Sequence, residues 1–212
     1  QLRLRLSKGP VKLSVDIETR GGHTACTGIA TSKTEAICIP WMCTDKKEGY
    51  WTADEELFLW NEFREILTHR NCQIIGQNWL YDSQYKWRFF FCKTYPWWDT
   101  MVTHHCMLPG TPKGLDYLAS LHCEHYVYWK DDGRLWKPGM GDDQQWKYNC
   151  QDCVYTFEIF ESQQPAIEKD ERLRSVWEFQ THKLVPMLFR AMLRGVKIDL
   201  ANRAKLAIEI TA

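Results

Sequence analysis

The chain has 212 residues, of which 44% are hydrophobic and 14% aromatic, enough to bury one good core. Lysine plus arginine and aspartate plus glutamate both number 27, so no global basic field predicts a nucleic-acid partner, and local charge or bound metal must attract any polyanion. Nine cysteines without a regular framework, with no signal peptide or long apolar run, favour reduced thiols, a cytoplasmic location and no membrane segment.

Residues 1–12 are basic, without an acid, and are expected to form a surface lead-in. The stretch 11–19, VKLSVDIET, alternates apolar and polar residues and predicts a strand. Asp16 and Glu18 lie two apart, so their carboxylates point to the same face, where a divalent cation would relieve their repulsion. An acidic, solvated turn is the alternative for a lone pair of this kind.

The following segments predict an antiparallel meander and then a helical crossover. After a glycine turn, strands are expected at 26–31 and 35–40. Thr52 and Glu55 form a capping-box pair that predicts a helix ending near His69. The apolar run 72–78 is expected to be a buried strand parallel to the first.

Two polar residues are expected at the carboxyl edge of this sheet. Asn78 ends the buried strand, and Asp82 lies in the first turn of a predicted helix, 79–92. Open α/β sheets place ligands at this edge, so Asp82 can reach Asp16. An aspartate in a first helical turn is more often a partner of the helix dipole, and the pattern alone leaves both roles open.

A short strand at 97–100 and helices at 101–108 and 113–121 come next, followed by an irregular segment, 122–142. Aromatic and basic side chains alternate there: Tyr126, Tyr128, Trp129, Lys130, Arg134, Trp136 and Lys137. This pattern is typical of a loop that stacks on unpaired bases and touches phosphates, and equally of aromatics packed beneath a surface loop.

A helix at 143–164 has two faces. The core face consists of Trp146, Cys150, Cys153, Phe157 and Phe160. Tyr148 and Asp152 lie one turn apart on the second face, with Tyr155 and Ile159. A long connecting helix is predicted over 166–195, bent at Pro186, with a docking side made of Val176, Phe179, Leu184, Met187, Leu188 and Met192.

The chain resembles the DEDD exonucleases of the DnaQ-like, ribonuclease H-like fold, whose three motifs are present in order. They are DIE with Asp16 and Glu18, NWLYD with Asp82, and YNCQD with Tyr148 and Asp152, the tyrosine being typical of the DEDDy branch. GQNWLYD, WDTMVTHHCMLPG, KGLDYLASL and RGVKIDL are similar to the proofreading domain of family A DNA polymerases, particularly phage-type ones. The resemblance implies an α/β fold, a mixed sheet with flanking helices followed by a long connecting helix.

The resemblance also implies a mechanism. Asp16, Glu18 and Asp152 would hold one Mg²⁺ or Mn²⁺, and Asp16 and Asp82 would help to hold a second, while Tyr148 would orient the attacking water. The reaction would release 5′-mononucleotides from the 3′ end of single-stranded or frayed DNA. The residues expected to contact that strand end are Thr19, Asn78, Tyr81 and Tyr128.

The predicted domains are an exonuclease domain, 1–164, and a connecting helix with the start of a truncated polymerase domain, 165–212. A polymerase palm cannot fit after Gln164, so the chain is expected to be a fragment or a partial gene product whose parent is a DNA polymerase, in a bacterial or phage-infected cell. Two alternatives stay open. One is a DEDDy exoribonuclease that trims RNA. The other is a zinc-stabilised binding module, suggested by His104, His105, Cys106, His122, Cys123, His125, Cys150 and Cys153.

Overall fold

A five-stranded mixed sheet forms the centre of the molecule, in the strand order β3-β2-β1-β4-β5. The structure is a computed structural model that describes residues 1–44, 46, 49–137 and 140–211. The first three strands form the predicted antiparallel meander, β1 (Val11–Arg20), β2 (His23–Ala30) and β3 (Ala36–Pro40), and β4 (Cys72–Gly76) pairs parallel to β1 as expected. The short β5 (Trp98–Asp99) adds to β4, also in parallel.

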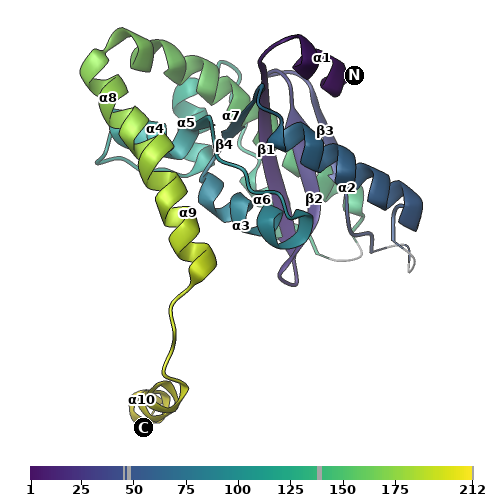
Figure 1. Ribbon diagram of the computed structural model, residues 1–212, viewed down its shortest axis with the longest axis vertical. Coiled ribbons are helices and arrows are strands. Elements are labelled where there is room, and N and C mark those ends of the chain that lie inside the picture. The colour runs from purple at the N-terminus through teal and green to yellow at the C-terminus, as the bar shows by residue number, and fades with distance from the viewer. Residues whose placement is uncertain (45, 47–48, 138–139, 212) are drawn as a thin grey trace.

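Helices cover both faces of this sheet (Figure 1). On one side, α1 (Leu2–Lys8), α2 (Ala53–Thr68) and α3 (Trp79–Phe90) bury an apolar cluster with the odd-numbered residues Val11, Leu13 and Val15 of β1. On the other side, α7 (Asp142–Lys169) crosses β1, β2 and β3. The alternation of strand side chains therefore turns the even-numbered residues of β1 toward α7.

Smaller helices complete the α7 side of the sheet. They are α4 (Thr100–Met107), α5 (Leu115–His122) and α6 (Lys130–Leu135). Asp99 joins this layer to the sheet: its carboxylate accepts hydrogen bonds from the backbone N–H groups of Asn78 and Trp79, and from Met101 and Val102 at the start of α4. One buried carboxylate thus caps α4 and fixes the start of α3 at the carboxyl edge of the sheet.

Three expectations about regular structure need correction. The segment expected to be a surface lead-in forms helix α1, and its Leu6 is completely buried against the sheet. The segment expected to be irregular contains helix α6. The expected single helix 166–195 is divided: α7 ends at Lys169, and Asp170 caps α8 (Glu171–Phe179) by accepting from the backbone N–H groups of Arg172 and Leu173.

The prediction of which side of this C-terminal segment docks was also wrong. Between residues 171 and 195 the buried residues are Trp177, Thr181, Val185 and Phe189, whereas five of the six expected ones are exposed. A spacing of four exceeds the 3.6 residues of an α-helical turn, and a π-helical turn, η1 (Gln180–Leu184), keeps these side chains on one face. The turn directly precedes α9 (Val185–Arg194), in which Pro186 has no N–H to donate.

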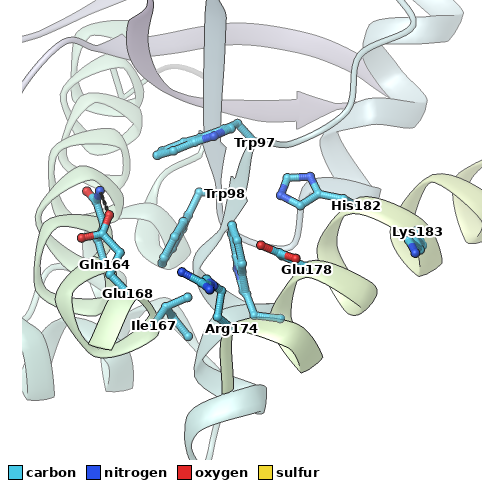
Figure 2. A pocket seen from close by; sticks show the side chains of 10 residues that line it. Trp97, Trp98, Gln164, Ile167, Glu168, Arg174, Glu178, His182 and Lys183 are labelled. Carbon is cyan, nitrogen blue, oxygen red and sulfur yellow. Dashed lines mark hydrogen bonds between the residues drawn. The ribbon is translucent and has the colours of Figure 1, made fainter. Parts of the chain in front are cut away.

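A cavity of about 450 Å³ lies where α8 and η1 meet the end of α7, and Figure 2 shows Trp97 and Trp98 on its wall. Gln164, which also lines the cavity, is twelve residues from Asp152, or about 18 Å along the α7 axis. Beyond α9, the helix α10 (Leu200–Thr211) has no buried residue and stands apart from the sheet (Figure 1). Within the described residues, no helix is long and apolar enough to cross a membrane.

Candidate active site and metal centre

Three carboxylates meet between β1 and α7. Asp16 and Glu18 come from the face of β1 that turns toward α7, and Asp152 comes from the third turn of that helix. One oxygen from each of the three lies within 4.8 Å of the others. The structure therefore brings together the three residues that the sequence predicts to hold one ion. We call Asp16, Glu18 and Asp152 the acid cluster.

Burial and mutual repulsion raise the free energy of the acid cluster when all three groups are ionised. Burial raises the pKa of Asp16 well above its ordinary value, and the charges of Asp82 and Asp152 add to the effect. Burial, followed by the charge of Asp152, raises the pKa of Glu18 to about 8. A divalent cation would stabilise the ionised forms, and a donor set made only of oxygens suits Mg²⁺ or Mn²⁺. The residues thus fit the expected ions.

Asp82 lies beside the acid cluster and approaches it from α3. The pairing of β1 with β4 extends only to Ser14 and Ile75, so the backbone of β1 beyond it has no strand partner on that side. Asp82 Oδ1 accepts the N–H of Ile17 there at 3.0 Å. Burial raises the pKa of Asp82 to about 6, against the opposing charge of Lys86, whose Nζ lies 3.6 Å from Oδ1. Asp82 is therefore adjacent to Asp16, as expected, and more than a dipole partner.

Tyr148 and Asp152 share one cation, Lys130, at the start of α6. Its ammonium donates to the Tyr148 hydroxyl at 2.8 Å and to the two carboxylate oxygens of Asp152 at 2.9 and 2.7 Å. The indole N–H of Trp129 donates to Asp152 Oδ1 at 2.5 Å. Sequence reasoning missed both residues as site residues, because it treated them only as aromatic and basic members of a loop.

Asn149 is a further neighbour that sequence reasoning missed. Its side-chain N–H donates to Asp16 Oδ2 at 2.7 Å, while its Oδ1 faces the thiols of Cys26 and Cys38 at 3.8 and 3.7 Å. The residue is completely buried between α7 and the sheet. Its position three residues before Asp152, on the side of α7 that meets β1, was the available signal.

The residues predicted to contact substrate are distributed around the end of β1. The hydroxyls of Thr19 and Tyr81 lie 2.9 Å apart, and Tyr81 is exposed. Asn78, also exposed, has the left-handed conformation, with φ of 57°, that turns the chain from β4 into α3. Tyr128 is exposed just before α6, and its hydroxyl donates to Asp131. The side chain of Arg134 lies outside the described part of the structure.

The histidines and cysteines behind the zinc alternative have other surroundings. His104 Nε2 lies 2.7 Å from the Thr111 hydroxyl, and His122 Nδ1 lies 2.9 Å from that of Ser162. Cys153 is completely buried in the core. Within the ranges that the structure describes, the acid cluster is the only group of three such side chains close enough to hold one ion.

Comparison with known proteins gives one family and several structures. Residues 2–168 match the family model described as 3′-5′ exonuclease, of the DNA polymerase A type. No curated protein sequence matches the chain. Brucella melitensis NrnC with bound Mg²⁺ is 16% identical with a TM-score of 0.63, over 90% of this chain and 90% of that one.

Two longer proteins contain the same fold. Escherichia coli RNase D, an exoribonuclease involved in structured RNA processing, is 14% identical with a TM-score of 0.64, over 90% of this chain and 48% of that one. The POL domain of Pol1 from M. smegmatis, in complex with DNA primer-template and dNTP, is 12% identical with a TM-score of 0.64, over 99% of this chain and 34% of that one. These structures share the DnaQ-like fold that the sequence predicts.

Proposed function

Because the chain belongs to the 3′-5′ exonuclease family of the DNA polymerase A type, we propose that it removes 5′-mononucleotides from the 3′ end of single-stranded or frayed DNA. The acid cluster carries the proposal, since three carboxylate oxygens within 4.8 Å of one another fit a divalent cation. Asp16, Glu18 and Asp152 would hold one Mg²⁺ or Mn²⁺, and Asp16 with Asp82 would hold a second. When bound, the two ions activate water and offset charge on the scissile phosphate and the leaving 3′ oxygen.

Tyr148 has the properties of a group that orients water and does not accept its proton. Burial raises the pKa of its phenol above the ordinary value, the charge of Asp152 raises it further, and Lys130 only partly opposes them. The hydroxyl therefore stays protonated at neutral pH and acts through its hydrogen bonds. Its position one turn before Asp152 would hold the attacking water in line with the terminal phosphodiester.

Thr19, Asn78, Tyr81 and Tyr128 are proposed to receive the strand end. The exposed Tyr81 offers a ring face for an unpaired base, and its hydroxyl is fixed by Thr19 at 2.9 Å. A paired end would have to fray before its last bases reach the acid cluster. Tyr128 offers a second exposed aromatic ring just before α6.

The parent protein is proposed to be a phage-type family A DNA polymerase, with this chain as its proofreading part. Residues 1–164 would form the exonuclease domain, and 165–212 would form the connection and the start of a polymerase domain. The exposed α10 supports this division, because an isolated helix of twelve residues is marginally stable without a packing partner. All nine cysteines are free, which suits the cytoplasm of a bacterial or phage-infected cell.

A DEDDy exoribonuclease is the second candidate function. The fold is shared with E. coli RNase D, an exoribonuclease involved in structured RNA processing. The same acid cluster could hydrolyse either polymer, because the ions act on the phosphodiester. DNA and RNA of one sequence therefore have to be compared directly.

The deciding experiment uses 5′-labelled single-stranded DNA and RNA, each with and without Mg²⁺. We expect a ladder that shortens from the 3′ end, only with metal and faster on DNA. Asp16→Ala should abolish it, since Asp16 is assigned to both ions, and should keep or raise the melting temperature without metal because it relieves repulsion. Metal-independent cleavage, or an unchanged rate for Asp16→Ala, would contradict the proposal. A primer-extension assay with all four deoxynucleotides tests for polymerase activity, and the chain should shorten the primer without extending it.

A further inference from the structure

The ammonium of Lys130 binds the Asp152 carboxylate, which the proposed metal ion would also bind. Its ammonium has three N–H donors, and three oxygens accept from it: both of Asp152, at 2.9 and 2.7 Å, and the Tyr148 hydroxyl, at 2.8 Å. The Lys130 side chain is only 17% exposed and that of Asp152 only 7%, so water screens this ion pair weakly.

The packing of α6 fixes Lys130 at this position. Trp129, 2% exposed, stacks on Tyr155 with ring centroids 4.2 Å apart. On the other side of Lys130, α6 lies so close to α7 that a Cβ added at Gly133 would be 2.6 Å from the Tyr148 ring. Lys130 therefore reaches Asp152 from a short helix that is packed on both sides of Lys130, unlike a lysine on a free loop.

We propose that Lys130 is the built-in counter-cation of the acid cluster, and that a divalent ion must displace Lys130 from Asp152 in order to bind. The inference rests on the proposed metal assignment. An ion bound to an Asp152 oxygen would lie close to an ammonium that contacts both oxygens, and two cations repel at this range. The Trp129 N–H is neutral and stays on Oδ1, so Asp152 keeps its orientation when Lys130 leaves. The Tyr148 hydroxyl remains as a partner for the ammonium.

The test is a calorimetric titration of the whole chain with Mn²⁺. Lys130→Met keeps most of the apolar stem but removes the charge, and should bind Mn²⁺ about tenfold more tightly, because the ion no longer competes with an ammonium for Asp152. Lys130→Arg keeps the competing charge and should stay within about twofold of the parent. The matched control is Lys147→Met on α7, since Lys147 is 78% exposed and pairs with Asp143 at the surface.

The outcomes separate this inference from the proposed function. Equal or weaker Mn²⁺ binding by Lys130→Met, with parental binding by Lys147→Met, would overturn the role of Lys130 and leave the metal site intact. If the parent chain bound no Mn²⁺, the metal assignment and this inference would both be overturned. Asp16→Ala should lose Mn²⁺ binding, which identifies the titrated site as the acid cluster.

A second measurement needs no variant and covers the case in which Lys130→Met does not fold. The unaltered chain is treated with formaldehyde and a borohydride reductant, with and without Mg²⁺, and methylation of each lysine is followed by mass spectrometry. Mg²⁺ should accelerate the methylation of Lys130 severalfold relative to Lys147, because displacement from Asp152 frees the amine. An unchanged ratio would show that Lys130 stays on Asp152 when the ion binds, and the inference would fail.

Discussion

Asn149 donates a hydrogen bond of 2.7 Å from α7 to Asp16 Oδ2 on β1. The bond joins the two elements that carry the acid cluster and fixes the orientation of the carboxylate assigned to both ions. Because Asn149 is completely buried, nothing in the solvent can replace this contact. The orientation of a metal ligand by a neighbour of this kind is a common determinant of metal affinity.

Replacing Asn149 should therefore impair the site without dismantling the fold. We expect Asn149→Leu, which has a similar volume, to lower the exonuclease rate by about 10 to 100-fold and to weaken Mn²⁺ binding in parallel. The rate is measured on single-stranded DNA and the affinity by calorimetry. The control is Gln151→Leu at an exposed position of the same helix. Parental rate and affinity in Asn149→Leu would show that the hydrogen bond serves packing only.

Gly28 keeps α7 close enough to β2 for that hydrogen bond to form. A Cβ at this position would lie 2.6 Å from both Asn149 Oδ1 and Cys153 Sγ, two completely buried side chains. Gly28→Ala should lower the free energy of unfolding by about 1–3 kcal/mol, the usual cost of an overpacked core. Urea denaturation measures this loss. Gly110→Ala, with nothing within 4 Å of the added carbon, should leave stability nearly unchanged.

Local regularities made much of the fold predictable from the sequence. The alternation of residues 11–19 fixes which side chains of β1 face α7, so it places Asp16 and Glu18 together without any tertiary information. The capping box at Thr52 and Glu55 is present as expected, and it marks the start of α2 correctly. These features depend on backbone geometry within a few residues of each position.

The features that were missed depend on contacts distant in the sequence. Lys130 reaches Asp152 across 22 residues, and no local pattern relates the two. Helix α1 was overlooked because its basic residues, Arg3, Arg5 and Lys8, indicated a surface segment, although its single buried leucine packs onto the sheet. Along α8 to α9 the buried residues repeat every four positions, and only the π-helical turn in the structure explains that spacing.

Tyr148 is expected to contribute alignment, and its replacement should affect turnover specifically. Tyr148→Phe keeps the ring that packs against Gly133 and loses the hydroxyl that accepts from Lys130 at 2.8 Å. We expect the single-turnover rate to fall by about 10 to 1000-fold, with affinity for single-stranded DNA little changed. Tyr155→Phe is the matched control, since its hydroxyl contacts the backbone of Val127, at 3.3 Å, away from Lys130. A parental rate for Tyr148→Phe would remove it from the site.

The raised pKa of Glu18 should make stability and metal binding depend on pH in opposite directions. Burial, followed by the charge of Asp152, raises the pKa of this carboxyl from 4.5 to about 8 in the folded protein. The folded state therefore keeps a proton that the unfolded chain has already released. In the presence of a chelator, the free energy of unfolding should fall as the pH rises from about 4.5 to about 8.

Metal binding requires the ionised carboxylate, so the affinity for Mn²⁺ should rise over the same pH range, with proton release. Urea denaturation in chelator and calorimetry in two buffers of different ionisation enthalpy measure the two effects. Glu18→Gln has no titrating group at this position, and its stability should depend less on pH than that of the parent. Glu161→Gln, at an exposed position of α7, should keep the parental dependence. An equal dependence in Glu18→Gln and the parent would mean that Glu18 is ionised in the folded protein throughout this range.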